Sequence, residues 1–160
     1  MHPDWQKYLD SLSPVKATAE SLKAHQQETV IVDLSDLGLI KASGSEWRSF
    51  LQGQLSSDLD QLSPTNSQLT SYNSPKGRIM ALMRLIETQD GAWLQLPQEI
   101  LEPIQKRLSM FIMRADVTME DQSSDWVRFG LYGPQASELL TPLVASLPSK
   151  QNDSVTEADV

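Results

Sequence analysis

Two short stretches of this 160-residue chain carry residue types that can bind a small anion or a heterocycle. In the first, "SYNSPKGR", Lys76 and Arg78 stand on either side of Gly77. Glycine permits a positive φ and close backbone approach, while ammonium and guanidinium groups donate hydrogen bonds to anions. Tyr72 and Asn73 add neutral donors and acceptors at the same place. The alternative is a plain β-hairpin tip with solvated cations, because Pro, Gly and Asn are common in turns.

The second stretch, "FLQGQLSSDL", offers amides and a carboxylate in place of cations. Gln52 and Gln54 can present side-chain amides to a heterocycle, and Asp58 can accept a hydrogen bond from a ring amine. A hydrogen bond to a charged group of this kind contributes about 1.5–3 kcal/mol. The local pattern also fits a helix C-terminus capped at Gly53, with Asp58 in the turn beyond.

The composition limits the kinds of site that the chain can hold. It has no cysteine, which excludes disulfides, thiolate zinc sites and a cysteine nucleophile. Two histidines, His2 and His25, are too few for a metal cluster. The net charge of −8 argues against a general nucleic-acid surface, so no direct nucleic-acid partner is expected. We expect no membrane span, no signal peptide and a cytoplasmic location, because no apolar run has the required length.

The elements that position these stretches alternate irregularly between short strands and helices, which predicts an α+β fold with a mixed, largely antiparallel sheet. Residues 29–44 predict a β-hairpin with its turn at "SDLG". Further strands are expected at about residues 68–72, 78–87, 92–96, 116–120 and 126–131. The apolar run within 78–87 predicts a strand that is buried on both faces.

Three helices are expected to accompany these strands. Ser43 and Glu46 have the spacing of a capping box, and Trp47 and Phe50 begin the apolar face of the helix that follows. Pro103 is expected in the first turn of the second helix, where its missing N–H costs nothing. The third helix begins at "GPQASELL".

The two ends differ from the middle of the chain in composition. Residues 1–28 predict an N-terminal helical appendage, with a second, polar-rich helix over about residues 20–27. Residues 29–147 form the predicted α+β domain. Residues 148–160 are polar, which predicts a tail or linker.

Taken in order, three segments resemble the N-terminal part of the YgfZ-type folate-binding proteins, relatives of the glycine-cleavage T-protein, a tetrahydrofolate-dependent aminomethyltransferase. They are "DLSDLGLIKASGSEWRSFLQGQLSSDL", "YNSPKGRIMALMRL" and "EPIQKRLSMFIMRADVTMED", and the resemblance covers about residues 29–140. It implies a ferredoxin-like α+β element within a ring of modules around a folate channel. It also implies a role in iron–sulfur protein maturation or repair and, through iron–sulfur enzymes, in tRNA modification.

Carried over to this sequence, the resemblance places one set of residues at the folate channel: Gln52, Gln54, Asp58, Tyr72, Asn73, Lys76, Gly77 and Arg78. The T-protein has two adjacent aspartates shortly after its Lys-Gly turn, and the matching positions here are Ala81 and Leu82. Neither side chain can transfer a proton, and loss of a general acid or base typically costs about 10²–10⁴ in rate. The resemblance therefore implies tetrahydrofolate binding with no catalytic residue.

Three functions are compatible with these residues. The first is a non-catalytic tetrahydrofolate-binding module that supports iron–sulfur protein maturation or repair, with iron–sulfur proteins or assembly factors as partners. The second is a protein-interaction module that kept the fold and lost the ligand. The third, a folate-dependent aminomethyltransferase or demethylase, is disfavoured by Ala81 and Leu82.

The family's downstream Lys-Gly-Cys-Tyr-x-Gly-Gln-Glu signature needs a cysteine and is absent from this chain. We expect either a naturally shortened relative or, as the polar tail favours, the N-terminal half of a longer protein. A missing C-terminal half, a partner or self-association would then cover the apolar surface that a half-ring exposes.

Overall fold

The computed structural model describes residues 1–12, 18–19, 23 and 28–155. The chain divides into two compact units, which are considered separately: residues 1–35 with 124–147, and residues 36–123 with 148–160. The helix predicted over about residues 20–27 lies almost entirely outside the described residues. The predicted domain boundaries along the chain stay a prediction, because compact units in space combine segments that are distant in sequence.

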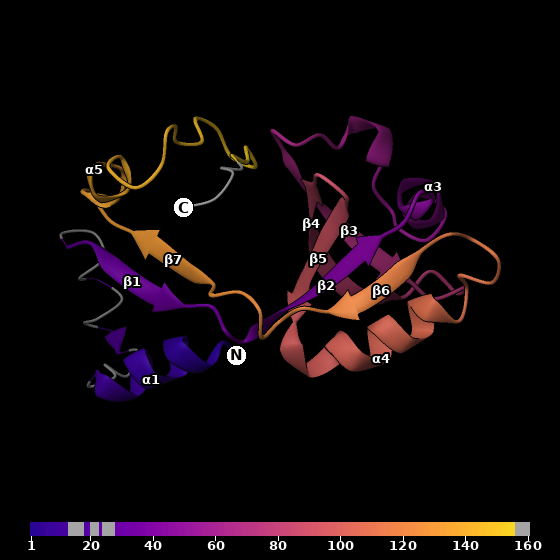
Figure 1. The fold of residues 1–160 in the computed structure, drawn as a ribbon, viewed down its shortest axis with the longest axis horizontal. Helices are drawn as coiled ribbons and strands as arrows, with labels where there is room; N and C mark the ends of the chain where they lie inside the picture. Colours follow the sequence, from indigo (N-terminus) through magenta and orange to yellow (C-terminus); the bar gives the residue numbers. More distant parts are fainter. Residues whose placement is uncertain (13–17, 20–22, 24–27, 156–160) are drawn as a thin grey trace. The chain divides into compact units, whose positions relative to one another are not determined.

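The larger unit is built on a five-stranded antiparallel sheet (Figure 1). Its strands are β2 (Leu37–Ser43), β3 (Ser67–Asn73), β4 (Ile79–Thr88), β5 (Gly91–Pro97) and β6 (Thr118–Asp121). Their spatial order is β3-β4-β5-β2-β6, and every neighbouring pair is antiparallel. The elements β2-α3-β4-β5-α4-β6 form a ferredoxin-like split β-α-β arrangement, with β3 as an additional edge strand. This confirms the predicted α+β class.

The hydrophobic core lies between this sheet and two helices, α3 (Trp47–Gln52) and α4 (Gln98–Ser109). Ile40, Leu94 and Leu85 are register neighbours on three adjacent strands, and each is 0% exposed. Leu51 of α3 and Leu101 of α4 belong to the same core, so both helices cover the face on which these three side chains lie. Neither of these two helices covers the opposite face of the sheet, where Leu39 and Lys41 of β2 are nevertheless only 4% and 7% exposed.

The β-hairpin predicted over residues 29–44 is wrong in its pairing, although both strands form. β1 (Val30–Asp33) pairs with β7 (Phe129–Tyr132), whereas β2 pairs with β5 and β6. The turn signal at "SDLG" is local, and it carries no information on partners that lie far along the chain.

The prediction that β4 is buried on both faces is also wrong. Ala81, Met83 and Leu85 are at most 3% exposed, whereas Leu82 is 63% exposed. Successive side chains of a strand point to opposite faces of the sheet. Leu82 and Arg84 therefore face the open side of β4, the first of them even though it is apolar.

The capping box predicted for the first helix of the sheet does not form. Ser43 is still part of β2, and its hydroxyl is 2.7 Å from the hydroxyl of Thr118. Glu46 is the N-cap of α3, but its Oε2 accepts from the Asp116 amide at 2.7 Å instead of capping the helix. The pairing of β2 with β6 thus takes both side chains away from the helix end.

The second predicted helix, α4, begins earlier than expected. Its first residue is Gln98, so Pro103 lies inside the helix and not in its first turn. Without an N–H, Pro103 cannot donate to the carbonyl four residues earlier, and the helix continues across this missing bond.

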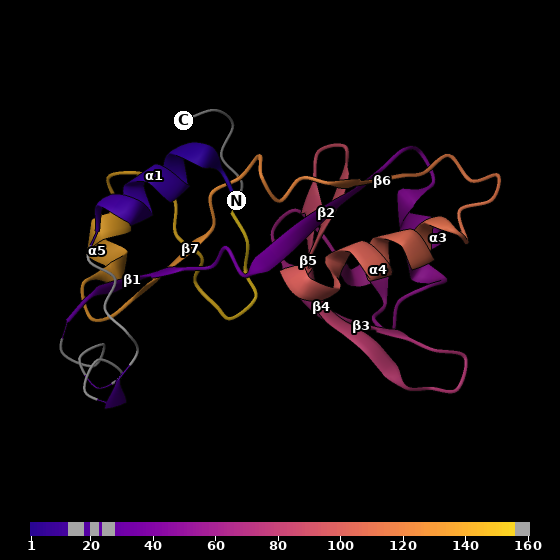
Figure 2. The same ribbon diagram turned by 90° about the horizontal axis from the view of Figure 1, so that it is seen from below.

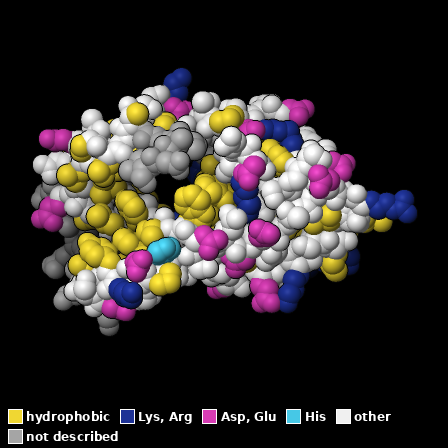
Figure 3. All heavy atoms as spheres, viewed as in Figure 1, with side chains coloured by type: hydrophobic (Ala, Val, Ile, Leu, Met, Phe, Trp, Pro, Cys, Tyr) yellow, Lys and Arg dark blue, Asp and Glu magenta, His cyan; other side chains and the backbone are white. Residues whose placement is uncertain are grey.

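The smaller unit consists of the two-stranded β1–β7 ribbon with two short helices, α1 (Pro3–Ser11) and α5 (Ala136–Leu140). Trp5 joins α1 to the ribbon: its Nε1 donates to Asp33 Oδ1 at 2.8 Å, and its ring stacks on Phe129 at 6.0 Å. No side chain of these four elements is buried. Ile31 is 59% exposed, and Figure 3 shows hydrophobic side chains gathered over β1 and β7.

Two absences concern the described residues only. Within them, no helix has the length and apolar character needed to cross a membrane. No group of three or more His, Cys, Asp or Glu side chains lies close enough to hold a metal ion in the same part of the chain.

A pair of variants in β4 tests its one-sided burial. Leu85→Ala is expected to lower the free energy of unfolding by about 2–5 kcal/mol, because it leaves a cavity in the core. Leu82→Ala makes the same chemical change on the exposed face and is expected to change that free energy by less than about 0.5 kcal/mol. Urea unfolding of both variants measures these values, and similar losses in the two would contradict the assignment of faces.

Candidate functional site

The segment that follows α3 runs beside β3 and brings the two predicted stretches to one edge of the sheet. Leu55 forms an isolated antiparallel bridge with Tyr72. The Ser56 amide donates to the Ser71 carbonyl at 3.0 Å, and the Ser71 amide donates to Ser56 Oγ at 3.0 Å. The chain after Gly53 therefore extends the sheet by a short irregular strand.

An open pocket of about 270 Å³ lies where these two stretches meet, lined by Ser56, Leu69, Thr70, Ser71 and Leu82. Leu69 and Leu82 are its apolar part and are 65% and 63% exposed. The other three side chains carry hydroxyls. A few hydrogen-bonding groups around an apolar surface are typical of a small-molecule site.

The hydroxyls of this pocket already form a connected cluster. Ser71 Oγ donates to Ser56 Oγ at 3.0 Å, and Thr70 Oγ1 accepts from the Ser57 amide at 3.2 Å. Ser57 Oγ is buried and has no hydrogen-bond partner among the described residues. Hydroxyls can both donate and accept, so this cluster can adjust to either kind of polar group on a ligand.

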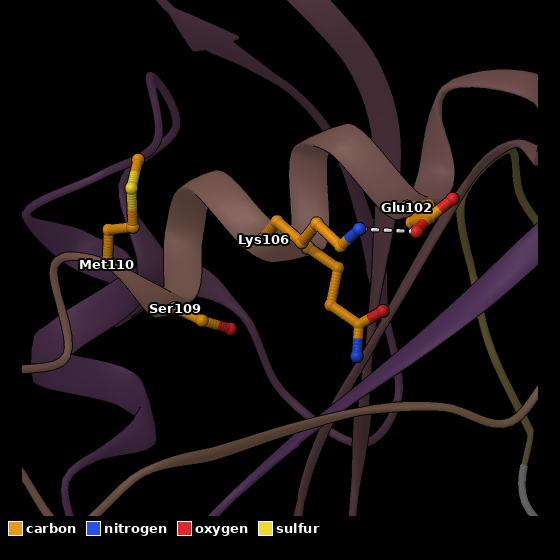
Figure 4. A pocket seen from close by; sticks show the side chains of 5 residues that line it. Glu102, Lys106, Ser109 and Met110 are labelled. Atoms are coloured by element: carbon orange, nitrogen blue, oxygen red, sulfur yellow. Dashed lines mark hydrogen bonds and ion pairs between the residues drawn. The ribbon is translucent and has the colours of Figure 1, made fainter.

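A larger hollow of about 540 Å³ lies on the outer side of α4 (Figure 4), lined by Glu102, Gln105, Lys106, Ser109 and Met110. Lys106 Nζ points to Glu102 Oε1 at 2.5 Å, and both side chains are more than 70% exposed. Such a surface pair at i,i+4 stabilises a helix only weakly. No residue of the two predicted stretches lines this hollow, so the smaller pocket is the better candidate site.

Gln52 and Asp58 lie together and hold the short η1 turn (Leu59–Gln61). Gln52 Oε1 accepts from the Leu59 amide at 2.6 Å, and its Nε2 donates to Asp58 Oδ1 at 3.3 Å. Asp58 Oδ1 also accepts from the Asp60 amide at 3.1 Å, which makes it the N-cap of the turn. These contacts shape the path of the chain toward β3, and ligand binding by the two residues stays a prediction.

Tyr72, Asn73 and Gln54 occupy different environments. Tyr72 is 4% exposed and is part of the hydrophobic core. Asn73 is exposed at the end of β3. Gln54 is half-buried and stands opposite Asn73 when the Leu55–Tyr72 register is continued by one residue. The polar pair is therefore better placed for a ligand than the tyrosine.

Lys76, Gly77 and Arg78 form the tip of the β3–β4 hairpin, which projects away from the two helices (Figure 2). Gly77 has a φ of +73°, and its amide donates to the Ser74 carbonyl at 2.9 Å. Lys76 and Arg78 are exposed, and neither forms an ion pair within the part of the chain that the structure describes. The hairpin geometry holds two cations that remain available to an anion.

Sequence reasoning missed the pocket itself, because it singled out charged and amide groups rather than hydroxyls. Leu69 and Ser71 alternate with core residues along β3, and Ser56 follows the predicted amide stretch. The run "SQLTSYN" does not alternate between apolar and polar residues, because exposed Leu69 and buried Tyr72 are three positions apart, so the sequence carries no periodic signal that assigns Leu69 and Ser71 to an open sheet face. Ala81 lies in the core, while Leu82 lines the pocket.

Comparison with known sequences matches the chain to one family model and to YgfZ proteins of two bacteria. The family model described as the GCVT N-terminal domain matches residues 5–156. The chain is 31% identical to the tRNA-modifying protein YgfZ of Colwellia psychrerythraea over 133 aligned residues. The aligned region covers 83% of this chain and 40% of that protein. It is 28% identical to the tRNA-modifying protein YgfZ of Escherichia coli over 128 aligned residues, a region that covers 79% of this chain and 39% of that protein. The chain thus spans about 40% of the length of these curated relatives.

Among solved structures, the chain is similar to the glycine cleavage system aminomethyltransferase T from Bartonella henselae. The TM-score is 0.72 over 88% of this chain and 42% of that chain, with 18% sequence identity. At this identity the likeness shows a shared fold. It confirms the fold that the resemblance to the T-protein and YgfZ-type proteins implied.

Two glycine variants test whether the hairpin tip depends on its backbone conformation. Gly77→Ala is expected to cost about 1–2 kcal/mol of folding free energy, because alanine disfavours a left-handed φ. No atom lies within 4 Å of the added methyl group, so steric contact is not the cause. Gly53→Ala is the matched control at a right-handed φ of −79°, where a change within about 0.5 kcal/mol is expected. Equal stability of both variants in urea unfolding would contradict the assigned conformation of Gly77.

Proposed function

This chain belongs to the GCVT N-terminal domain family, and from that membership we propose that it binds a tetrahydrofolate-class ligand without catalysing group transfer. The observation that carries the proposal is the pocket at which the two predicted stretches meet. A bicyclic heterocycle has an apolar face and a hydrogen-bonding edge. Leu69 and Leu82 suit the face, and the hydroxyls of Ser56 and Ser71 suit the edge.

The anionic part of the ligand is assigned to the hairpin tip. Tetrahydrofolate carries carboxylates on its glutamate, and Lys76 and Arg78 are exposed cations without a partner in the described chain. The amides of Gln52 and Gln54, Asn73, and the carboxylate of Asp58 supplement this set in the proposal. Tyr72 contributes by holding β3 in the core, because its ring is buried.

The absence of catalysis is supported by the chemistry of the pocket. Its lining consists of serine, threonine and leucine side chains, none of which ionises near neutral pH. Leu82 is part of that lining, at a position that the resemblance matches to one of the adjacent aspartates of the T-protein. A general acid or base must lie within hydrogen-bond reach of the proton that it transfers. The side chains that line this pocket can position a ligand but not exchange protons with it.

The biological role proposed for the module is support of iron–sulfur protein maturation or repair and, through it, of tRNA modification. The YgfZ relatives are named as tRNA-modifying proteins, which supports the second part. Iron–sulfur proteins or assembly factors are the proposed partners, and a cytoplasmic location stays a prediction.

A second candidate function is a protein-interaction module that does not need the ligand. It is favoured by the β1–β7 ribbon, where Ile31, Phe129 and Tyr132 are 59%, 47% and 53% exposed. A two-stranded ribbon is only marginally stable alone, so this surface is proposed to pack against a partner, a second copy or a C-terminal half.

Calorimetric titration with tetrahydrofolate tests the first proposal. Saturable binding is expected for the unmodified chain, and Lys76→Ala or Arg78→Ala is expected to weaken it about tenfold or more, since each removes a charge-assisted hydrogen bond. Lys106→Ala on α4 is the control and is expected to leave binding unchanged. No heat at high ligand concentration, or an equal loss in the control, would contradict the assignment. Folate-dependent aminomethyl transfer by the chain would contradict the absence of catalysis.

A further inference from the structure

Arg84 lies on the open face of β4 with a guanidinium that no carboxylate of the described chain neutralises. Its Nη1 donates to Ser67 Oγ at 2.8 Å and to Asn152 Oδ1 at 2.9 Å. Both acceptors are neutral, and Nε and Nη2 donate to no protein atom within the described residues. A guanidinium presents five donors in a planar fork that matches a carboxylate, so most of this capacity is unused.

The register of the sheet places Arg84 at the border of the pocket. Leu69 stands directly opposite Arg84, and Leu82 precedes it by two residues on the same face. Opposed side chains are about 4.5–5.5 Å apart at Cβ, and positions i and i+2 on one strand are about 6.6 Å apart. An arginine side chain is long enough to reach a ligand held by Leu69 and Leu82, although the guanidinium in this structure is bonded to Ser67, on the side of Arg84 away from Leu82.

The other cation whose register places it on this face is not available. Lys41 is 7% exposed, and its ammonium is bonded to Asp90 and to Thr88. The hydrogen bond from Lys41 lowers the pKa of Asp90, which keeps that carboxylate charged. Arg84 differs in that its neighbours across the strands, Leu69 and Gln95, carry no charge.

The segment that supplies the Asn152 acceptor is held against the start of β3. The Ser67 amide donates to the Asn152 carbonyl at 2.7 Å, and the Ser154 amide donates to the Thr65 carbonyl at 2.9 Å. Asp153 Oδ2 closes the segment by accepting from the Lys150 amide at 2.8 Å. The part of the chain predicted as a polar tail or linker thus covers one side of the Arg84 guanidinium.

We propose that Arg84 is a carboxylate-binding residue of the open sheet face and that Asn152 covers it with a neutral amide oxygen in the absence of ligand. The ligand class is a small molecule with an apolar or planar part for the pocket and a carboxylate for the guanidinium. A carboxylate can accept two parallel hydrogen bonds from an arginine, and such charged bonds are roughly twice as strong as neutral ones. Where the ligand is tetrahydrofolate, the inference rests on the proposed function and assigns one glutamate carboxylate to Arg84.

A stability cycle tests the carboxylate site without any ligand. Asn152→Asp replaces the amide oxygen with a tethered carboxylate and is expected to raise Tm by about 2–4 °C, as a gain of one kcal/mol does in a chain of this size. In the Arg84→Gln background the same change is expected to give no rise. Gln151→Asp adds the same charge one residue away and is expected to leave Tm unchanged. No rise with Asn152→Asp, or an equal rise without Arg84, would overturn the proposal.

A pair of ligands tests the site in binding, with calorimetry of tetrahydrofolate and of 6,7-dimethyltetrahydropterin, which has no carboxylate. Arg84→Gln and Asn152→Asp are each expected to weaken tetrahydrofolate binding about tenfold or more and to leave pterin binding unchanged. Asn152→Ala is expected to strengthen tetrahydrofolate binding, because it uncovers the guanidinium. Unchanged tetrahydrofolate affinity in Arg84→Gln would overturn the proposal. If the unmodified chain binds neither compound, the proposed function fails, and the stability cycle alone decides whether Arg84 accepts a carboxylate.

Discussion

The two-residue period of a β-strand gives β4 two unlike faces, and the candidate site depends on this constraint. Ala81, Met83 and Leu85 enter the core, which fixes the register of β4 against β3 and β5. The side chains at the intervening positions must then point to the opposite face of the sheet. Leu82 and Arg84 must face the open surface, where the first lines a pocket and the second carries a free charge. A slip of one residue would bury the guanidinium and expose the core.

The sequence predicted this fold wherever the decisive interactions are local or periodic. The β3–β4 hairpin follows from its Pro-Lys-Gly turn, and β5 follows from the next turn. Pairing between distant strands was not predictable in this way, since the partner of Val30 is Tyr132. The apolar run of β4 gives a wrong prediction of burial on both faces, because an apolar pattern shows whether a residue can be buried, and not whether a helix is present to bury it. Leu82 is apolar and yet 63% exposed for that reason.

The sequence likewise predicts one part of the candidate site and not the other. The charged hairpin tip was visible in sequence, because glycine between two cations is a local pattern. The hydroxyl pocket was not, because it forms only when Ser56 is brought beside Ser71 by the turn that Gln52 and Asp58 hold. Gln52 and Asp58, which the sequence predicts as ligand-binding residues, thus stabilise the backbone that forms the pocket. Their removal would affect ligand binding through the position of Ser56, even without contact between either residue and the ligand.

The two candidate functions use different parts of the chain and do not compete for residues. The pocket, the hairpin tip and Arg84 all belong to the unit with the buried core, which is stabilised by its own packing. The exposed apolar ribbon belongs to the other unit, whose helices and strands have no buried side chain. Association through the ribbon would stabilise that unit by covering apolar area, with no requirement for an occupied pocket. The proposed ligand would instead bind the open face of the sheet, at the pocket and Arg84. Because the two proposals rest on different residues, a substitution that removes one property need not remove the other.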